Sequence, residues 1–205
     1  MDVVRLLGSV LGLGFVAGLR LYGTVLVIGL SIRYSLFHPS GELAGLAVLA
    51  DKRVLIVAGI AFVLEFFADK ILWFDSIWDS FHTFIRPIGA AVLAATAVHD
   101  VEPATKVAIV ILCGGVALAS HSSKAATRLA VNHSPQPFSN IALSIAGDLF
   151  VPVGVWVALS HPVVSLAFIA GFVAVFVWLS RKVFRLLMRR RQNKIDGSQA
   201  PSGSL

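Results

Sequence analysis

Residues 163–179, VVSLAFIAGFVAVFVWL, contain no charged side chain, and residues 180–191, SRKVFRLLMRRR, follow them directly with six bases. About 20 mostly apolar residues are enough for a helix to cross the hydrocarbon core of a bilayer. A basic segment directly after such a helix is typical of the cytoplasmic flank of a membrane span, where Lys and Arg are attracted to anionic lipid. This stretch therefore predicts a transmembrane helix with a basic cytoplasmic end.

The composition of the 205-residue chain extends this prediction to the whole protein. Apolar residues make up 57% of the chain and charged residues only 14%, and the mean hydropathy is +0.86, whereas a soluble domain is about one-quarter charged. The net charge of +6 comes from residues 181–196, which hold seven bases and one acid, because the remainder holds ten of each. This distribution argues against a nucleic-acid partner and makes membrane lipid the expected partner of the basic segment.

Six apolar runs predict an all-α membrane protein with about six transmembrane helices, some of them short or discontinuous. The runs are residues 6–32, 54–68, 87–98, 107–120, 141–159 and 163–179, and Gly41–Ala50 is a shorter interfacial or re-entrant piece. Six crossings place both termini in the cytoplasm with twelve of the seventeen bases, as the positive-inside rule requires. We expect a polytopic domain over residues 1–187 and a basic, then polar, disordered tail over residues 188–205.

The first run contains five glycines and one charged residue, Arg20. Small residues four positions apart let helices approach closely in lipid, so we interpret the glycines as a packing surface, with a flexible break near Arg20 as the alternative. The glycines are Gly8, Gly12, Gly14, Gly18 and Gly23. An arginine in mid-span needs a buried acidic partner, and Asp69 and Asp148 are the predicted partners.

More ionisable residues follow the second run. Glu65 and Asp69 share a helical face, and the next helical stripe consists of Asp75, Asp79, His82 and Arg86. In one interpretation, the stripe lies on an interfacial amphipathic helix whose acids pair with Lys70 and Arg86. In the other, it is a polar wall that carries protons or binds a divalent metal through Asp75, Asp79 and His82. Three ligands without a fourth are an incomplete metal signature, so we favour the interfacial helix.

A second polar cluster follows the run of residues 107–120. His121, Lys124 and Arg128 lie on one helical face, beside the hydroxyls of Ser120, Ser123 and Thr127. Two permanent cations with hydroxyls can hold an anionic group such as a phosphate or a carboxylate. The alternative is a structural network, in which the two cations neutralise Glu65, Asp69 or Asp148. From the sequence, we favour neither the anion site nor the structural network over the other.

Asp148 interrupts an apolar run and is a functional candidate, with Arg20 or Arg128 as its expected partner. The sequence around Asp148 also shows internal similarity, because LSIAGD (residues 143–148) resembles LEFFAD (64–69). In the same way, AATRL (125–129) resembles AGLRL (17–21). Many transporters consist of two inverted repeats that meet at mid-membrane. A repeat of three plus three helices is therefore a further hypothesis, and chance similarity between apolar segments is the alternative.

These polar segments also carry a resemblance. The chain resembles a bacterial membrane family known only as domain of unknown function 4126, in the segments 17–22, 67–70, 75–79, 82–87, 124–128, 132–135 and 137–140. The resemblance covers most of the chain up to about His161 and implies a bacterial inner-membrane protein. It implies no activity, and Gly147 stands where a second acid beside Asp148 is expected, so no paired-carboxylate role follows.

The leading functional hypothesis is a small transporter or channel for an ion or a small polar or anionic solute. Its path would be lined by the ionisable residues described above, and the protein would work without a cofactor, with a homo-oligomer among the expected assemblies. An embedded enzyme acting on a lipid phosphate is the second hypothesis; it lacks a nucleophile with an oriented base. A scaffold whose ion pairs only fix helix packing is the third.

Overall fold

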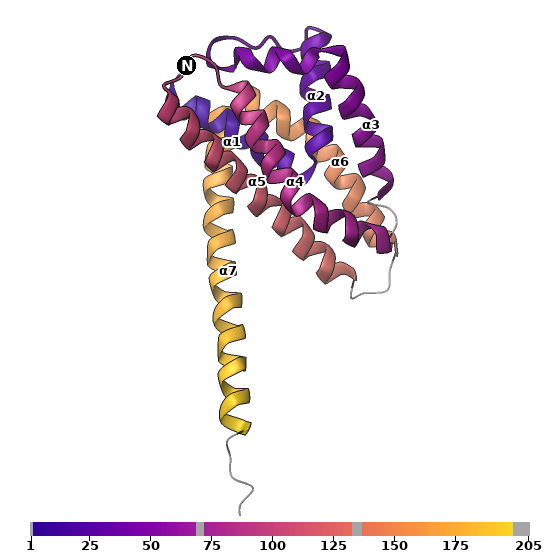
Figure 1. Ribbon diagram of the computed structural model, residues 1–205, viewed down its shortest axis with the longest axis vertical. Helices are drawn as coiled ribbons and strands as arrows, with labels where there is room; N and C mark the ends of the chain where they lie inside the picture. The colour runs from indigo at the N-terminus through magenta and orange to yellow at the C-terminus, as the bar shows by residue number, and fades with distance from the viewer. Residues whose placement is uncertain (1, 69–71, 133–136, 199–205) are drawn as a thin grey trace, which may run out of the picture. The chain divides into compact units, whose positions relative to one another are not determined.

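The computed structural model describes residues 2–68, 72–132 and 137–198, and these residues form helices and loops without a β-strand. The elements are α1 (Val3–Leu19), α2 (Leu21–Arg33), the 3-10 helix η1 (Gly41–Ala50), α3 (Lys52–Ala68), α4 (Leu72–Ala97), α5 (Pro103–Asn132), α6 (Pro137–Ser160) and α7 (Pro162–Ser198) (Figure 1). The chain divides into two units, Met1–Ile169 and Ala170–Leu205. The first is a helical bundle, and the second is the remainder of α7. The predicted all-α architecture is confirmed.

The first apolar run forms two helices instead of one. Only Arg20 leaves the helical conformation, with φ −149° and ψ 86°. Its backbone stays hydrogen-bonded, because its N–H donates to the Val16 carbonyl and its own carbonyl accepts from the Thr24 N–H (2.9 and 3.0 Å). Figure 1 shows the change of direction between α1 and α2.

Contacts along the neighbouring helices give the directions of α1 and α2. Gly14 lies against Cys113 and Gly18 against Ser120, so α1 runs parallel to α5. On α2, Gly23 lies against Phe62 and Gly29 against Leu55, so this helix runs antiparallel to α3.

The remaining helices alternate in direction. The polar pairs Arg86 with His121 and Asp79 with Arg128 make α4 antiparallel to α5. Gly45 of η1, which precedes α3, meets Thr96 near the end of α4, so α3 and α4 are also antiparallel. It follows that α1 and α2 are antiparallel and form a helical hairpin with Arg20 at its tip. Residues 6–32, expected to be one crossing, return to the end of the bundle from which they started.

Glycines explain how the hairpin fits among the other helices. The α1 backbone lies against the Pro162 carbonyl at Gly8, the Ser165 side chain at Gly12, Cys113 at Gly14 and Ser120 at Gly18. A side chain at these positions would hold the helices apart, so the predicted packing role of the glycines is confirmed. The break at Arg20, the alternative interpretation, is present as well.

Several helices extend beyond the apolar runs that predicted them. The run 87–98 is the second half of α4, because Pro87 lies inside that helix and does not end it. Likewise, α5 continues through the polar residues after Ser120 to Asn132. Its start is capped by the Glu102 carboxylate, which accepts bonds from the N–H groups of Thr105 and Ala104 (2.9 and 3.1 Å), and these bonds lower the pKa of Glu102. The helix α7 includes residues 188–198, which we assigned to the tail.

Two helical segments of the described chain are both long and apolar enough to cross a membrane, Pro103–Arg128 and Pro162–Leu186. Six crossings are not confirmed, and neither is the three-plus-three repeat. The two similar segments 17–21 and 125–129 differ in local structure, because Arg20 breaks a helix, whereas Arg128 lies within the continuous helix α5. The mean hydropathy and the length of these two helices support a membrane protein.

We expect Gly18→Ala to destabilise the bundle, because its methyl group would collide with the Ser120 hydroxyl and the Ala117 carbonyl. Overpacking of this kind costs about 1–3 kcal/mol. The measurement is the thermal unfolding midpoint of the detergent-solubilised protein. Gly115→Ala in α5 is the matched control, since nothing lies within 4 Å of the added methyl group and alanine favours a helix. Equal midpoints for the two variants would contradict the close packing of α1.

Candidate functional site

Below the hairpin tip, α3, α4, α5 and α6 bring together a set of buried and half-buried polar side chains, here called the polar cluster. Its members are Arg20, Glu65, Asp79, His82, Arg86, His121, Lys124, Arg128, Ser144 and Asp148. Burying so many ionisable groups costs several kcal/mol each unless they are paired or wetted. Their partners therefore determine both the packing and the chemistry of the site.

Arg86 lies at the centre of the polar cluster and is fully buried. Its guanidinium forms a 2.8 Å ion pair with Glu65 of α3 and a 3.4 Å ion pair with Asp79, which lies about two turns earlier on the same face of α4. It also contacts the His121 ring on α5. A planar group with five N–H donors suits this position, because it can bond three partners at once. Arg86 thus joins α3, α4 and α5.

The contacts of His121 identify its tautomer. Its Nδ1 faces the Arg86 guanidinium, which only donates, so Nδ1 must accept. Nε2 therefore carries the proton and can donate to the Asp79 carbonyl at 3.2 Å or to the Thr83 hydroxyl at 3.1 Å. His121 is neutral in this arrangement and adds no charge beside Arg86.

Arg20 projects from the hairpin tip towards α6. Its guanidinium lies 3.1 Å from the Asp148 carboxylate and donates to the Ser144 hydroxyl and carbonyl at 3.0 and 3.1 Å. The predicted buried acidic partner of Arg20 is confirmed as Asp148. Asp69, the other predicted partner, lies outside the described residues.

The cations of α5 connect the hairpin to α4. Lys124 Nζ donates to the Leu19 carbonyl at 3.3 Å, next to the break, and Arg128 lies 3.6 Å from the second oxygen of Asp79. The expected hydroxyl lining is wrong in part. Ser120 donates to the carbonyls of Phe15 and Ala117, and Thr127 donates to the Ser123 carbonyl. These two hydroxyls therefore satisfy backbone groups and are not directed at a shared anion.

His82 and Glu65 each bury an atom without a hydrogen-bond partner among the described residues. His82 Nδ1 donates to the Trp78 carbonyl at 2.9 Å, which leaves Nε2 as an unpaired acceptor. Its ring stacks on Trp78 and meets Tyr22 edge to face. Glu65 uses Oε1 for Arg86, and its Oε2 has no partner in the described chain. Unsatisfied buried acceptors can receive a donor from a ligand, an ion or water.

The described part of the polar cluster contains four permanent cations and three acids. The cations are Arg20, Arg86, Lys124 and Arg128, and the acids are Glu65, Asp79 and Asp148. Asp69 and the Asp75 side chain lie outside the described residues.

The structure brings together nine of the eleven predicted site residues. The exceptions are Asp69, which lies outside the described residues, and Asp75, whose side chain does. The favoured interpretation of the stripe on α4 expected its acids to pair with Arg86, and Asp79 does so at 3.4 Å. However, Asp79, His82 and Arg86 are buried in the bundle and do not form an exposed polar face. The described residues contain no group of three potential metal ligands, and the proposed triad includes the undescribed Asp75 side chain.

Sequence reasoning missed Ser144 and Tyr22. Ser144 sits four residues before Asp148, so the two share a helical face, and that spacing is the signal that could have identified it. Tyr22 carried no such signal, because it reaches His82 only through the turn at Arg20.

Comparisons with known proteins give one match. A family model described as a domain of unknown function (DUF4126) matches residues 7–182, which include every described member of the polar cluster. No curated protein and no solved structure matches the chain.

Arg128→Ala should lower the stability of the bundle, because it removes a cation from Asp79 in a poorly solvated position. Loss of one partner of a buried pair costs on the order of 2–3 kcal/mol here, since Asp79 keeps Arg86 as its other partner. Thermal unfolding in detergent measures the effect. Arg5→Ala removes the same side chain from an exposed position on α1 and should leave the midpoint unchanged. If both variants unfold at the parent midpoint, the Arg128 to Asp79 pair contributes nothing to stability.

Proposed function

The chain belongs to the DUF4126 family, and because that description assigns no activity, we propose a function from the site itself. We propose that the protein is a multi-pass membrane protein that binds a small anionic solute in the polar cluster below the hairpin tip and passes it across the bilayer.

The distribution of polarity supports the membrane location. Arg20, Arg86 and Glu65 are at most 1% exposed, whereas Phe84 is 73% exposed. Large apolar side chains are exposed along all the longer helices, for example Ile60 on α3, Ile88 on α4, Ile111 on α5, Trp156 on α6 and Val175 on α7. A protein surrounded by water exposes its charges and avoids large apolar patches. The reverse arrangement suits a bundle surrounded by lipid.

The hairpin changes the expected topology. The expected placement of both termini in the cytoplasm required residues 6–32 to cross the membrane once, but α1 and α2 run antiparallel. The first two turns of α7 run parallel to α1, because Pro162 meets Gly8 and Ser165 meets Gly12. With α3 to α7 as five crossings, the basic end of α7 lies in the cytoplasm and the N-terminus lies on the opposite side. We propose this arrangement in the cytoplasmic membrane.

One observation carries the proposed solute binding: Arg20, the only non-helical residue between α1 and α2, shares the polar cluster with three further permanent cations, Arg86, Lys124 and Arg128. Non-helical backbone at membrane depth is tolerated where it is buried in protein or lines a wet cavity, and transporters use such breaks to bind substrates. Guanidinium and ammonium groups gathered at such a break can hold an oxyanion through charge-assisted hydrogen bonds.

Partial exposure supports a route to this site. The side chains of Asp79 and Asp148 are 11% and 16% exposed, whereas those of Arg20, Arg86 and Glu65 are at most 1% exposed. Asp79 lies near the start of α4, and its partner Arg128 lies near the end of α5. This is the end of the bundle opposite to the N-terminus, so a solute would reach the cluster from the cytoplasmic side of the proposed topology.

A scaffold remains the second function, because a specific observation favours it. Two cluster cations already bond to backbone carbonyls, Lys124 to that of Leu19 and Arg20 to that of Ser144, and the neighbouring Ser120 bonds to that of Phe15. Such bonds hold the hairpin in place without any ligand. Transport and scaffolding differ in what a conservative change at a cation does to function.

Flux measurements in proteoliposomes test the proposal. The purified chain should mediate flux of at least one of chloride, nitrate, phosphate and acetate, and should not mediate flux of sodium or potassium. Arg128→Lys keeps the charge but loses the planar donor geometry that binds an oxyanion, so it should reduce the flux about tenfold while unfolding at nearly the parent temperature. Parent-like flux in Arg128→Lys would instead assign Arg128 a structural role.

Arg20→Gln should abolish the same flux, because it removes the cation at the helix break. Arg5→Gln is its matched control, since Arg5 lies on the same helix but is exposed, and its flux should equal that of the parent. Absence of flux for all four anions, or flux of a cation, would refute anion transport.

The topology gives a separate expected outcome. A reporter that is active only in the cytoplasm should be active after Leu205 and inactive before Asp2, because five crossings separate the two ends. Activity at both ends would mean that residues 6–32 cross the membrane once. Activity at the N-terminus alone would invert the whole layout.

A further inference from the structure

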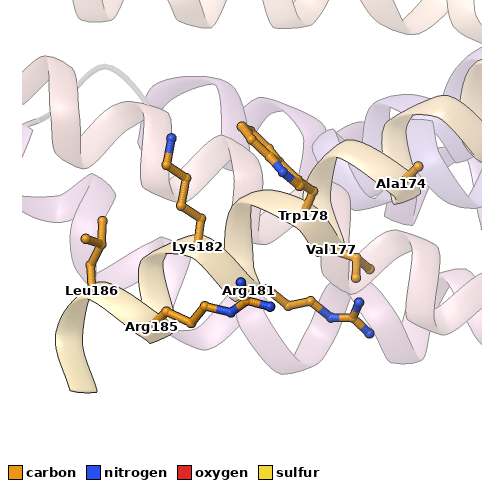
Figure 2. A pocket seen from close by; sticks show the side chains of 7 residues that line it. All are labelled: Ala174, Val177, Trp178, Arg181, Lys182, Arg185 and Leu186. Atoms are coloured by element: carbon orange, nitrogen blue, oxygen red, sulfur yellow. The ribbon is translucent and has the colours of Figure 1, made fainter. Parts of the chain in front are cut away.

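A second ligand site lies on α7, outside the polar cluster. The side chains of Trp178, Arg181, Lys182 and Arg185 line a shallow surface pocket together with Ala174, Val177 and Leu186 (Figure 2). All seven residues belong to α7 within the unit Ala170–Leu205. We propose that this pocket binds the phosphate headgroup of an anionic glycerophospholipid. This inference rests on the proposed membrane location but not on the transport of a solute.

The position of the pocket along α7 matches headgroup depth. From Pro162 to Leu179 the helix is apolar and about 27 Å long at 1.5 Å per residue, close to the thickness of the hydrocarbon core. The first bases follow at Arg181 and Lys182. Trp178 sits at the boundary between the two segments, where aromatic rings with a polar N–H are enriched in membrane proteins. The pocket therefore spans the level at which lipid phosphates lie.

The geometry of the pocket favours a discrete headgroup over a diffuse basic surface. Trp178 and Lys182 are four residues apart, and the Lys182 ammonium lies 5.1 Å from the centre of the Trp178 ring. Figure 2 shows both side chains projecting from the same side of α7, with the guanidinium groups of Arg181 and Arg185 beside the helix. The ring contact restrains the lysine, and a guanidinium can bond two phosphate oxygens at once. One cation thus packs against the Trp178 ring, and two guanidinium groups also line the pocket.

Apolar side chains complete the fit to a lipid. Ala174 and Val177 extend the pocket towards the apolar half of α7, where Val175 and Leu179 are also exposed. A soluble phosphate compound would have no use for this apolar extension, whereas an acyl chain would lie along it. The charges and the apolar strip together match a lipid whose headgroup is anionic.

The test is native mass spectrometry of the full-length protein in detergent, titrated with phosphatidylglycerol or with phosphatidylcholine. The parent should retain phosphatidylglycerol at about tenfold lower lipid concentration than phosphatidylcholine. Changing Arg181, Lys182 and Arg185 together to Gln should remove that preference. Trp178→Leu keeps the apolar character but loses the ring, and should weaken retention of phosphatidylglycerol about threefold.

A matched variant separates a built pocket from general attraction to basic residues. Arg189, Arg190 and Arg191 changed together to Gln remove the same charge farther along the chain, and this variant should keep the parent preference. Equal losses in the two triple variants would overturn the proposal in favour of diffuse electrostatics. Glycerol phosphate that displaced the lipid at equal concentration would assign the pocket to a soluble ligand instead. None of these outcomes depends on whether the polar cluster transports an anion.

Discussion

The arrangement of the bundle depends on how the charge of Arg20 is accommodated. A guanidinium at the tip of two apolar helices can be buried only if another element supplies an acid, and Asp148 of α6 does so at 3.1 Å. Ser144 bonds the same guanidinium, so two positions one turn apart align α6 with the tip. Lys124 then bonds the Leu19 carbonyl and connects the tip to α5. The glycines of α1 become necessary as a result, because the hairpin must fit between helices that these bonds already hold close together.

Much of the architecture could be predicted from the sequence, because apolar runs and polar stripes depend on local periodicity. The helical content and the packing glycines were predicted in this way, and nine of the eleven residues that the polar stripes suggested lie together in the structure. The hairpin could not be predicted from the sequence, because the chain reverses through the dihedral angles of one residue. Nothing in the sequence around Arg20 resembles a turn. The ends of α4 were also missed, because Pro87 is a helix breaker by local rules, yet α4 continues through it. The partners of Ser120 and Thr127 depend on tertiary packing and on the local turn, so their spacing alone suggested a ligand that they do not face.

The members of the polar cluster are strongly paired with one another, but two of its described acceptor atoms lack a hydrogen-bond partner. Arg86 has three partners, and Arg20 has two, so the described cations are well held. Even so, Glu65 Oε2 and His82 Nε2 are buried without a hydrogen-bond partner in the described chain. A network built only for packing would be expected to satisfy its buried atoms, because each unsatisfied one costs free energy. These two atoms are where the described cluster can accept a hydrogen bond from water or a ligand.

The pairing of Arg20 with α6 has a consequence for biogenesis. Arg20 leaves the ribosome 128 residues before Asp148, a delay of roughly 6 to 25 s at about 5–20 residues per second. During that interval the arginine has no acid from α6, and Glu65 and Asp79 become available before Asp148 does. In the proposed membrane location, the hairpin tip would not be at its final depth until α6 is made, since an uncompensated arginine is expensive in lipid. The last bundle helix to be synthesised before α7 would then complete the placement of the first.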